Sequence, residues 1–161
     1  ARGYFMYRSD NGGSYKKIKT ISSGSTLEYY DKNNLSNGSR YKYKIVACYS
    51  TSNMSAPSAY KEIYRVNKVV MTGVSNSAAK TITVKWKRIY ATTGYQIRYA
   101  TKSDFSDKTY VYVSGGSKVT TSIKNLVKGK KYYVSVRAVK KANGTYYYGA
   151  WSSPITVTVK K

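Results

Sequence analysis

Apolar and polar side chains alternate along several short stretches of the sequence. Ile82, Val84 and Trp86 are separated by single polar residues, so they would share one face of an extended strand. The same alternation occurs in residues 95–99, 132–138 and 155–159. Clusters of Ser, Thr, Asn and Gly separate these stretches, and no helical period is sustained. The pattern predicts an all-β chain, with seven short strands within residues 67–161 packed as one β-sandwich.

The sequence also repeats itself at a spacing of 91 residues. The Gly-Tyr pair that opens residues 3–8 also opens residues 94–99. Three further landmarks keep this offset, which pairs Leu35 with Leu126, Gly38 with Gly129 and Tyr41 with Tyr132. Only near the end does the offset change, where Pro57 pairs with Pro154 at a spacing of 97. The second copy therefore carries six extra residues in one loop, which contains the turn-forming pair Asn143-Gly144.

The landmarks of the second copy resemble the signature of the fibronectin type III family. The segment Leu126-x-x-Gly129-x-x-Tyr132 is similar to the family's Leu-x-x-Gly-x-x-Tyr motif, and Trp86 stands on the second strand, as in the family. The resemblance implies an immunoglobulin-like β-sandwich in which Tyr132 is the corner tyrosine, whose hydroxyl bonds back to the backbone. We therefore predict fibronectin type III β-sandwiches in tandem.

The first copy lacks the beginning of the second. It repeats the family signature at three positions, Leu35, Gly38 and Tyr41. Because Ala1 aligns with Thr92, the 25 residues from 67 to 91 have no counterpart. We predict a partial module without its first two strands at residues 1–66, and a complete module at residues 67–161. Either the sequence was cut from a longer protein, or a strand from another chain completes the first module.

Two segments indicate where such a protein would work. The Gly-Tyr-x-x-Tyr-Arg run of residues 3–8 and the Tyr-Gly-Ala-Trp-Ser run of residues 148–152 resemble the form common in bacterial extracellular proteins. The resemblance implies a secreted or cell-surface location. No stretch approaches the roughly 20 apolar residues that a membrane span needs.

The charge balance changes the expected partners. Twenty-nine Lys and Arg face six Asp and Glu, a net +23, of which residues 66–161 carry +16 and residues 1–65 carry +7. The cations at outward strand positions of the second module are Lys85, Lys87, Arg98, Lys124, Lys131 and Arg137. Such a surplus favours an anionic glycan or wall polymer as partner, and the alternative is a solvated, self-repelling surface. We do not expect nucleic acid, because a sandwich offers no helix to read a groove.

The sequence lacks the residues on which most enzymes rely. It contains no His, so no Ser-His or Cys-His pair and no imidazole base can form. Asp104 and Asp107 come closest to a paired-carboxylate site, and we interpret them as part of a solvated turn. With Cys48 as its one Cys, the chain has no cluster typical of a transition-metal site. We expect no enzymatic activity, no cofactor and no metal.

The loop with the six extra residues holds the candidate contact site. It carries a run of aromatic residues flanked by cations: Tyr146, Tyr147, Tyr148 and Trp151, with Arg137, Lys140 and Lys141. Aromatic rings at the end of a sandwich can stack on sugars or anchor a protein partner. The alternative is that Trp151 and some of the tyrosines pack on the sandwich itself.

We predict non-catalytic modules that serve as a spacer and as an adhesion or interaction region of a larger bacterial protein, next to its other domains. The family resemblance implies this role, whereas the residue spacing shows only the modules. Two alternatives stay open. The chain is either a cationic module that binds glycans or anionic wall polymers, or an accessory part of a secreted hydrolase.

Overall fold

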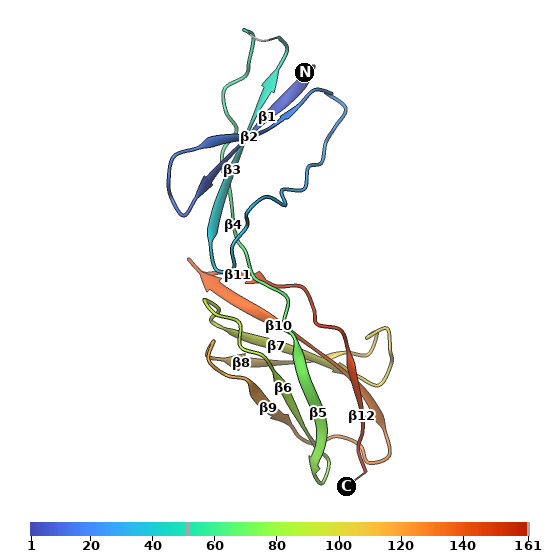
Figure 1. Cartoon of the computed structure of the whole chain (residues 1–161). Coiled ribbons are helices and arrows are strands. Elements are labelled where there is room, and N and C mark those ends of the chain that lie inside the picture. The colour runs from blue at the N-terminus through green and yellow to red at the C-terminus, as the bar shows by residue number, and fades with distance from the viewer. Residues whose placement is uncertain (51, 161) are drawn as a thin grey trace. The chain divides into compact units, whose positions relative to one another are not determined.

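The computed structural model describes residues 1–50 and 52–160, and its regular elements are all β-strands (Figure 1). The chain divides into two compact units, unit 1 (residues 1–65) and unit 2 (residues 66–161). The division lies one residue before the predicted domain boundary. None of the described residues forms a helix long and apolar enough to cross a membrane. The all-β, immunoglobulin-like fold class is thus confirmed.

Unit 1 is one four-stranded antiparallel sheet in the order β2-β1-β3-β4. Its strands are β1 (Gly3–Asp10), β2 (Lys16–Ile21), β3 (Arg40–Cys48) and β4 (Lys61–Tyr64). β1 and β3 pair along their whole lengths, from Gly3 opposite Cys48 to Asp10 opposite Tyr41. The Tyr41 hydroxyl accepts a hydrogen bond from the Ser36 backbone N–H at 2.8 Å. Within residues 1–50 and 52–65, no second sheet covers this one.

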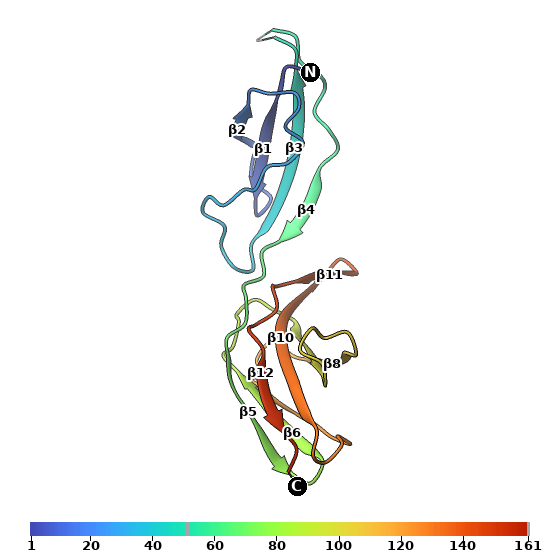
Figure 2. The same ribbon diagram turned by 90° about the vertical axis from the view of Figure 1, so that its right-hand side faces the viewer.

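Unit 2 has two facing sheets (Figure 2). The smaller has the order β5-β6-β9, and the larger has the order β11-β10-β7-β8, with β12 also paired to β10. Their bounds are β5 (Met71–Ala78), β6 (Thr81–Trp86), β7 (Gly94–Ala100), β8 (Thr109–Ser114), β9 (Thr120–Ile123), β10 (Lys131–Ala142), β11 (Thr145–Tyr148) and β12 (Ile155–Thr158). The strand beyond the predicted seven is β11, because the six extra residues lengthen β10 and add a partner strand to it.

The core of unit 2 lies between its two sheets. Ile82 and Val84 of β6 are fully buried, as are Ile97 of β7 and Val134 and Val136 of β10. Burial of each such side chain stabilises the fold by about 1.5–3 kcal/mol. The alternation of apolar residues read from the sequence therefore gives the inward faces of these strands correctly.

Two turns hold the strands of unit 2 in place. Asn143 and Gly144 both have positive φ values, 48° and 77°, as a two-residue hairpin between right-twisted strands requires, so the hairpin predicted there is confirmed. The Tyr132 hydroxyl accepts a hydrogen bond from the Val127 backbone N–H at 3.1 Å. This bond ties the start of β10 to the connection that precedes it.

Candidate functional site: the aromatic face of unit 2

The outer surface of the β11-β10-β7-β8 sheet carries a cluster of aromatic and arginine side chains. We call it the aromatic face, and its members are Arg98, Phe105, Tyr110, Tyr112, Arg137, Tyr146, Tyr148 and Trp151. Pairing between strands sets their positions, because residues directly opposite in a sheet project to the same side. Arg98 of β7 lies opposite Tyr110 of β8, and Gln96 of β7 lies between Tyr112 of β8 and Arg137 of β10.

Aromatic rings and guanidinium groups alternate in a stack across this face. The Arg98 guanidinium carbon lies 3.9 Å from the Phe105 ring centre and 4.5 Å from that of Trp151. The guanidinium carbon of Arg137 lies 4.4 Å from the Trp151 ring centre and 3.8 Å from that of Tyr148. Each contact is within the range of a cation–π interaction, so the stack is a continuous ladder of five side chains.

The segment after β11 places Trp151 in this ladder. The backbone N–H groups of Gly149 and Ser152 donate to the carbonyls of Ala138 and Val136 of β10, at 3.0 and 2.8 Å. The Ser152 hydroxyl, which is buried, accepts the Val136 N–H at 2.9 Å. The segment is therefore fastened along β10 on both sides of Trp151, and the indole lies over the outer surface of the sheet.

The two arginines of the ladder lie beneath the aromatic rings and are half-buried. The Arg137 Nε donates to the buried Oε1 of Gln96 at 2.7 Å, whereas the buried Nε of Arg98 has no hydrogen-bond partner among the described residues. Burial lowers the pKa of both guanidinium groups. Arg98 and Arg137 hold the outward strand positions where the sequence placed them, and the rings over them leave both side chains half-buried.

Four tyrosines of the aromatic face remain open to solvent. The exposed fractions are 63% for Tyr112, 49% for Tyr146, 42% for Tyr110 and 40% for Tyr148. The Tyr146 and Tyr148 rings stack at 6.4 Å with an angle of 18° between their planes, and Tyr110 stacks on Trp151 at 6.2 Å. Tyr110 and Tyr146 thus rest on two members of the ladder, Trp151 and Tyr148.

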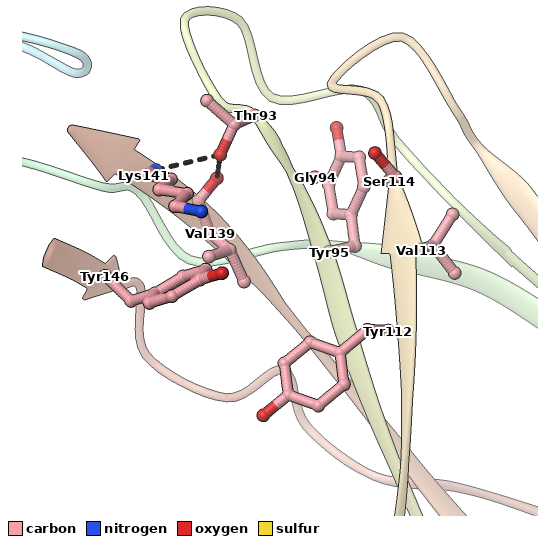
Figure 3. A pocket seen from close by; sticks show the side chains of 9 residues that line it. All are labelled: Thr93, Gly94, Tyr95, Tyr112, Val113, Ser114, Val139, Lys141 and Tyr146. Carbon is pink, nitrogen blue, oxygen red and sulfur yellow. Dashed lines mark hydrogen bonds between the residues drawn. The ribbon is translucent and has the colours of Figure 1, made fainter. Parts of the chain in front are cut away.

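A hollow of about 460 Å³ opens beside these rings (Figure 3). Tyr112 of β8 and Tyr146 of β11 border it, and Gly94 contributes no side chain to it. The Lys141 ammonium nitrogen lies 5.1 Å from the Tyr146 ring centre. The Thr93 hydroxyl donates to the Val139 carbonyl at 3.1 Å and accepts the Lys141 backbone N–H at 2.8 Å.

The chemistry available at the hollow is stacking, hydrogen bonding and one positive charge. The rings of Tyr112 and Tyr146 can stack, the Ser114 hydroxyl can donate or accept, and Lys141 can pair with an anion. Among residues 1–50 and 52–160, no group of three or more His, Cys, Asp or Glu side chains could hold a metal ion. The hollow is suited to recognising a ring-shaped, partly polar or anionic group.

A model of a known protein family matches most of unit 2. The family model of the fibronectin type III domain matches residues 70–158, more than half of the sequence. The chain belongs to the fibronectin type III family. A comparison with curated proteins finds no match.

Solved structures similar to this chain include two chicken proteins with several fibronectin type III domains. The FN1–FN3 domains of chicken CNTN1 are 22% identical with a TM-score of 0.52, and the alignment covers 99% of this chain and 56% of that one. A two-domain segment of chicken tenascin is 22% identical (TM-score 0.49; 99% and 84% covered), and a structure described as a myokine is 17% identical (TM-score 0.49; 60% and 100% covered). The CNTN1 likeness shows the fold, and the present chain spans just over half the length of that chain.

The fibronectin type III sandwich divides the predicted contact residues between two faces. Five of them lie on or beside the aromatic face: Arg137, Lys141, Tyr146, Tyr148 and Trp151. Tyr147 instead packs against the core. Lys140 lies opposite Tyr147 in the β10–β11 pairing, so it projects to that same side. A run of consecutive residues on a strand must divide in this way, because successive side chains point to opposite faces.

Sequence reasoning missed three members of the aromatic face, Phe105, Tyr110 and Tyr112. The alternation of Tyr110 and Tyr112 was visible in the sequence and marks one face of a strand. What the sequence did not show is that β8 lies two strands away from β10, on the far side of β7. Phe105 gave no such signal, because it lies in a turn with a φ of 59°.

Proposed function

We propose that the chain is a pair of non-catalytic extracellular modules, a spacer and interaction region of a larger bacterial surface or secreted protein. Membership of the fibronectin type III family supports the non-catalytic role. The observation that carries the interaction role is the set of four exposed tyrosines on the aromatic face. Such a surface leaves apolar rings exposed to water in the free protein, which is unfavourable. Contiguous exposed aromatic groups typically mark a contact site.

The ladder beneath the tyrosines strengthens this proposal. Tyr and Trp are enriched among the residues that dominate binding energy at protein interfaces. Rings that already hold their bound orientation lose less entropy when a partner arrives. Tyr148 is held by Arg137 at 3.8 Å and by Tyr146, so it satisfies this condition without a partner.

An adhesion assay tests the interaction role. Beads coated with the whole chain are applied to immobilised mucin and collagen, and the retained fraction is counted under flow. We expect the double variant Tyr112→Ser/Tyr146→Ser to lose most retention, at least tenfold. The control is Tyr90→Ser, which removes a tyrosine of unit 2 that is 70% exposed and lies outside the aromatic face. No retention of the unmodified chain, or equal retention of the two variants, would contradict the proposal.

The hollow favours a second candidate function, the binding of acidic glycans or anionic wall polymers. Its lysine lies beside an exposed aromatic ring, and residues 66–161 carry 18 Lys and Arg against 2 Asp. A sugar ring would stack on Tyr146 or Tyr112 while its carboxylate or phosphate pairs with Lys141. The shielded arginines of the ladder leave this pairing to lysine.

Substitutions of two neighbouring lysines distinguish binding at the hollow from attraction by net charge alone. The chain is passed over immobilised heparin and teichoic acid at low and at physiological salt. We expect Lys141→Ala to weaken retention severalfold and Lys140→Ala, which changes the charge equally on the other face, to have little effect. Equal losses in the two variants would show that net charge alone binds the polymer and would exclude the hollow as the site.

A further inference from the structure

Strand β8 forms an open edge of the larger sheet of unit 2 (Figure 1). It is the last strand in the order β11-β10-β7-β8, and no strand of the described residues other than β7 pairs with it. An edge of this kind presents backbone N–H and C=O groups to which another extended chain can bond. Binding there uses the backbone of β8, so it does not depend on the adhesion role proposed for the exposed tyrosines.

The pairing of β10 fixes the direction of the backbone groups in this sheet. The carbonyls of Ala138 and Val136 accept hydrogen bonds from the segment after β11, at 3.0 and 2.8 Å, so the backbone groups of these two residues point away from β7. Because consecutive residues of a strand point their backbone groups to opposite sides, Arg137 between them points its own toward β7. It lies opposite Gln96, whose backbone groups therefore point to β10.

The same alternation carries through β7 to β8. Ile97 follows Gln96, so its backbone groups point the other way, to Val111 of β8 directly opposite. The residues of β8 alternate in turn on either side of Val111. The open edge thus presents the N–H and C=O groups of Tyr110, Tyr112 and Ser114.

The side chains of β8 would offer an added strand two different surfaces. Tyr110 and Tyr112 lie on the aromatic face. Val111 and Val113 point the other way, pack against the core of unit 2 and remain half-buried. An added strand would set alternate side chains beside the valines and the rest beside the tyrosines. Apolar side chains suit the positions beside the valines, because they would extend the core.

Strand β8 also lacks the features that protect an edge from pairing. Its six residues, Thr109–Ser114, include no charged residue and no Pro, and its register with β7 runs without a bulge. The other edges differ: β2 carries three lysines and pairs with β1 through a bulge, and the register of β5 shifts twice. Strands β4, β9, β11 and β12 have only four residues each. Because lysines, bulges and short length all discourage edge pairing, β8 is the edge best suited to receive a strand.

Charge indicates the chemistry of that strand. Residues 66–161 carry 18 Lys and Arg against 2 Asp. The two carboxylates, Asp104 and Asp107, accept hydrogen bonds from nearby backbone N–H groups before β8. Lys108 and Lys118, which are exposed, stand on either side of β8 in the sequence. A positive charge of this size attracts an acidic segment and speeds its association.

A second copy of the chain is a poorer partner. Two copies would bring positive charges together, and the four acids of unit 1 already have partners: Asp10, Glu28, Asp31 and Glu62. The Asp31 carboxylate accepts from the Arg8 guanidinium at 2.8 Å and from the Tyr43 hydroxyl at 3.0 Å. Burial by itself raises the pKa of Asp31, but these bonds and the Asn33 backbone N–H outweigh it, so the pKa of Asp31 is lowered. A second copy would therefore bring repulsion without an acidic strand.

We propose that β8 binds an extended acidic segment of another protein, which joins the sheet as an antiparallel strand along Tyr110, Tyr112 and Ser114. Main-chain hydrogen bonds supply the affinity, and alternate side chains supply the specificity. In antiparallel pairing, the residues whose backbone groups face β8 lie opposite Tyr110 and Tyr112 and share their side of the sheet. Acidic residues take these positions, which are open to solvent, and apolar residues take the positions beside Val111 and Val113.

A designed peptide tests the backbone pairing on the unmodified chain. A fluorescent peptide of about eight residues that alternates Glu and Val is titrated into the whole chain, and its polarisation is measured. We expect saturable binding, which replacement of every Glu by Lys abolishes. N-methylation of every Glu, which removes the N–H groups that face β8, should weaken binding at least tenfold. N-methylation of every Val leaves the peptide with the same charge and should have little effect.

Two substitutions of Tyr112 repeat the test on the protein. Tyr112→Pro removes an edge N–H and no bond to β7, and edge strands tolerate Pro, so peptide binding should weaken at least tenfold. Tyr112→Ser removes the ring but keeps the N–H, so most of the binding should remain. Absence of saturable binding to the unmodified chain, equal losses from the two methylation patterns, or equal binding of the Lys peptide would overturn the proposal. Dimerisation that Tyr112→Pro abolishes would also overturn it, because a second copy would then be the occupant.

Discussion

Replacing Trp151 by alanine removes the central side chain of the ladder. The indole contacts the Arg98 and Arg137 guanidinium groups at 4.5 and 4.4 Å, and each partly desolvated cation–π contact contributes about 1 kcal/mol. The stack on Tyr110 adds about 0.5–1 kcal/mol. We expect Trp151→Ala to destabilise unit 2 by about 3 kcal/mol. For a unit of this size the thermal midpoint would fall by roughly 12–20 °C.

Urea unfolding followed by tryptophan fluorescence measures this cost. The chain has two tryptophans, both in unit 2, so every Trp151 variant leaves the buried Trp86 as the only reporter of that unit. Trp151→Phe is the matched control, because it keeps an aromatic ring between the arginines and should lose less than half as much. Equal unfolding midpoints for the two variants would refute the ladder as a source of stability.

Three further outcomes follow from the geometry. Gly94→Ala would bring a Cβ atom within 2.4 Å of the Val113 carbonyl, so urea unfolding should show a loss of about 2 kcal/mol, whereas Gly73→Ala meets nothing within 4 Å and should be neutral. Tyr132→Phe leaves a backbone N–H without its acceptor and should cost about 1–3 kcal/mol by the same assay. Because the pKa of Asp31 is lowered on folding, unit 1 should lose stability as pH falls below about 4, and Asp31→Asn should flatten that loss in thermal melts against pH.

The fold of unit 2 could be predicted because its signals are local and repeated. Alternation placed Ile82, Val84 and Trp86 inside, and the Asn143-Gly144 pair marked a hairpin that the backbone confirms. The hairpin predicted at Asn143-Gly144 already implies β11, and the count of seven strands falls one short because β10 pairs both with β11 and, further along, with β12.

The candidate site was less predictable, because it depends on which strands are neighbours. Arg137 reads from the sequence as a free cation on an outward position. Its shielding depends on Trp151, which reaches the same surface from a segment 14 residues later. Charge counted along the sequence therefore overstates the cations that unit 2 offers to a polyanion.

The two units differ in what supplies their second layer. In unit 2, Trp86 and its hairpin bury the inner surface of the large sheet, while Trp151 and the ladder cover the outer one. The described part of unit 1 forms a single sheet, and one layer cannot bury both of its faces. Apolar burial is the main favourable contribution to folding, so unit 2, with both surfaces of its large sheet covered, should unfold at a higher urea concentration than unit 1.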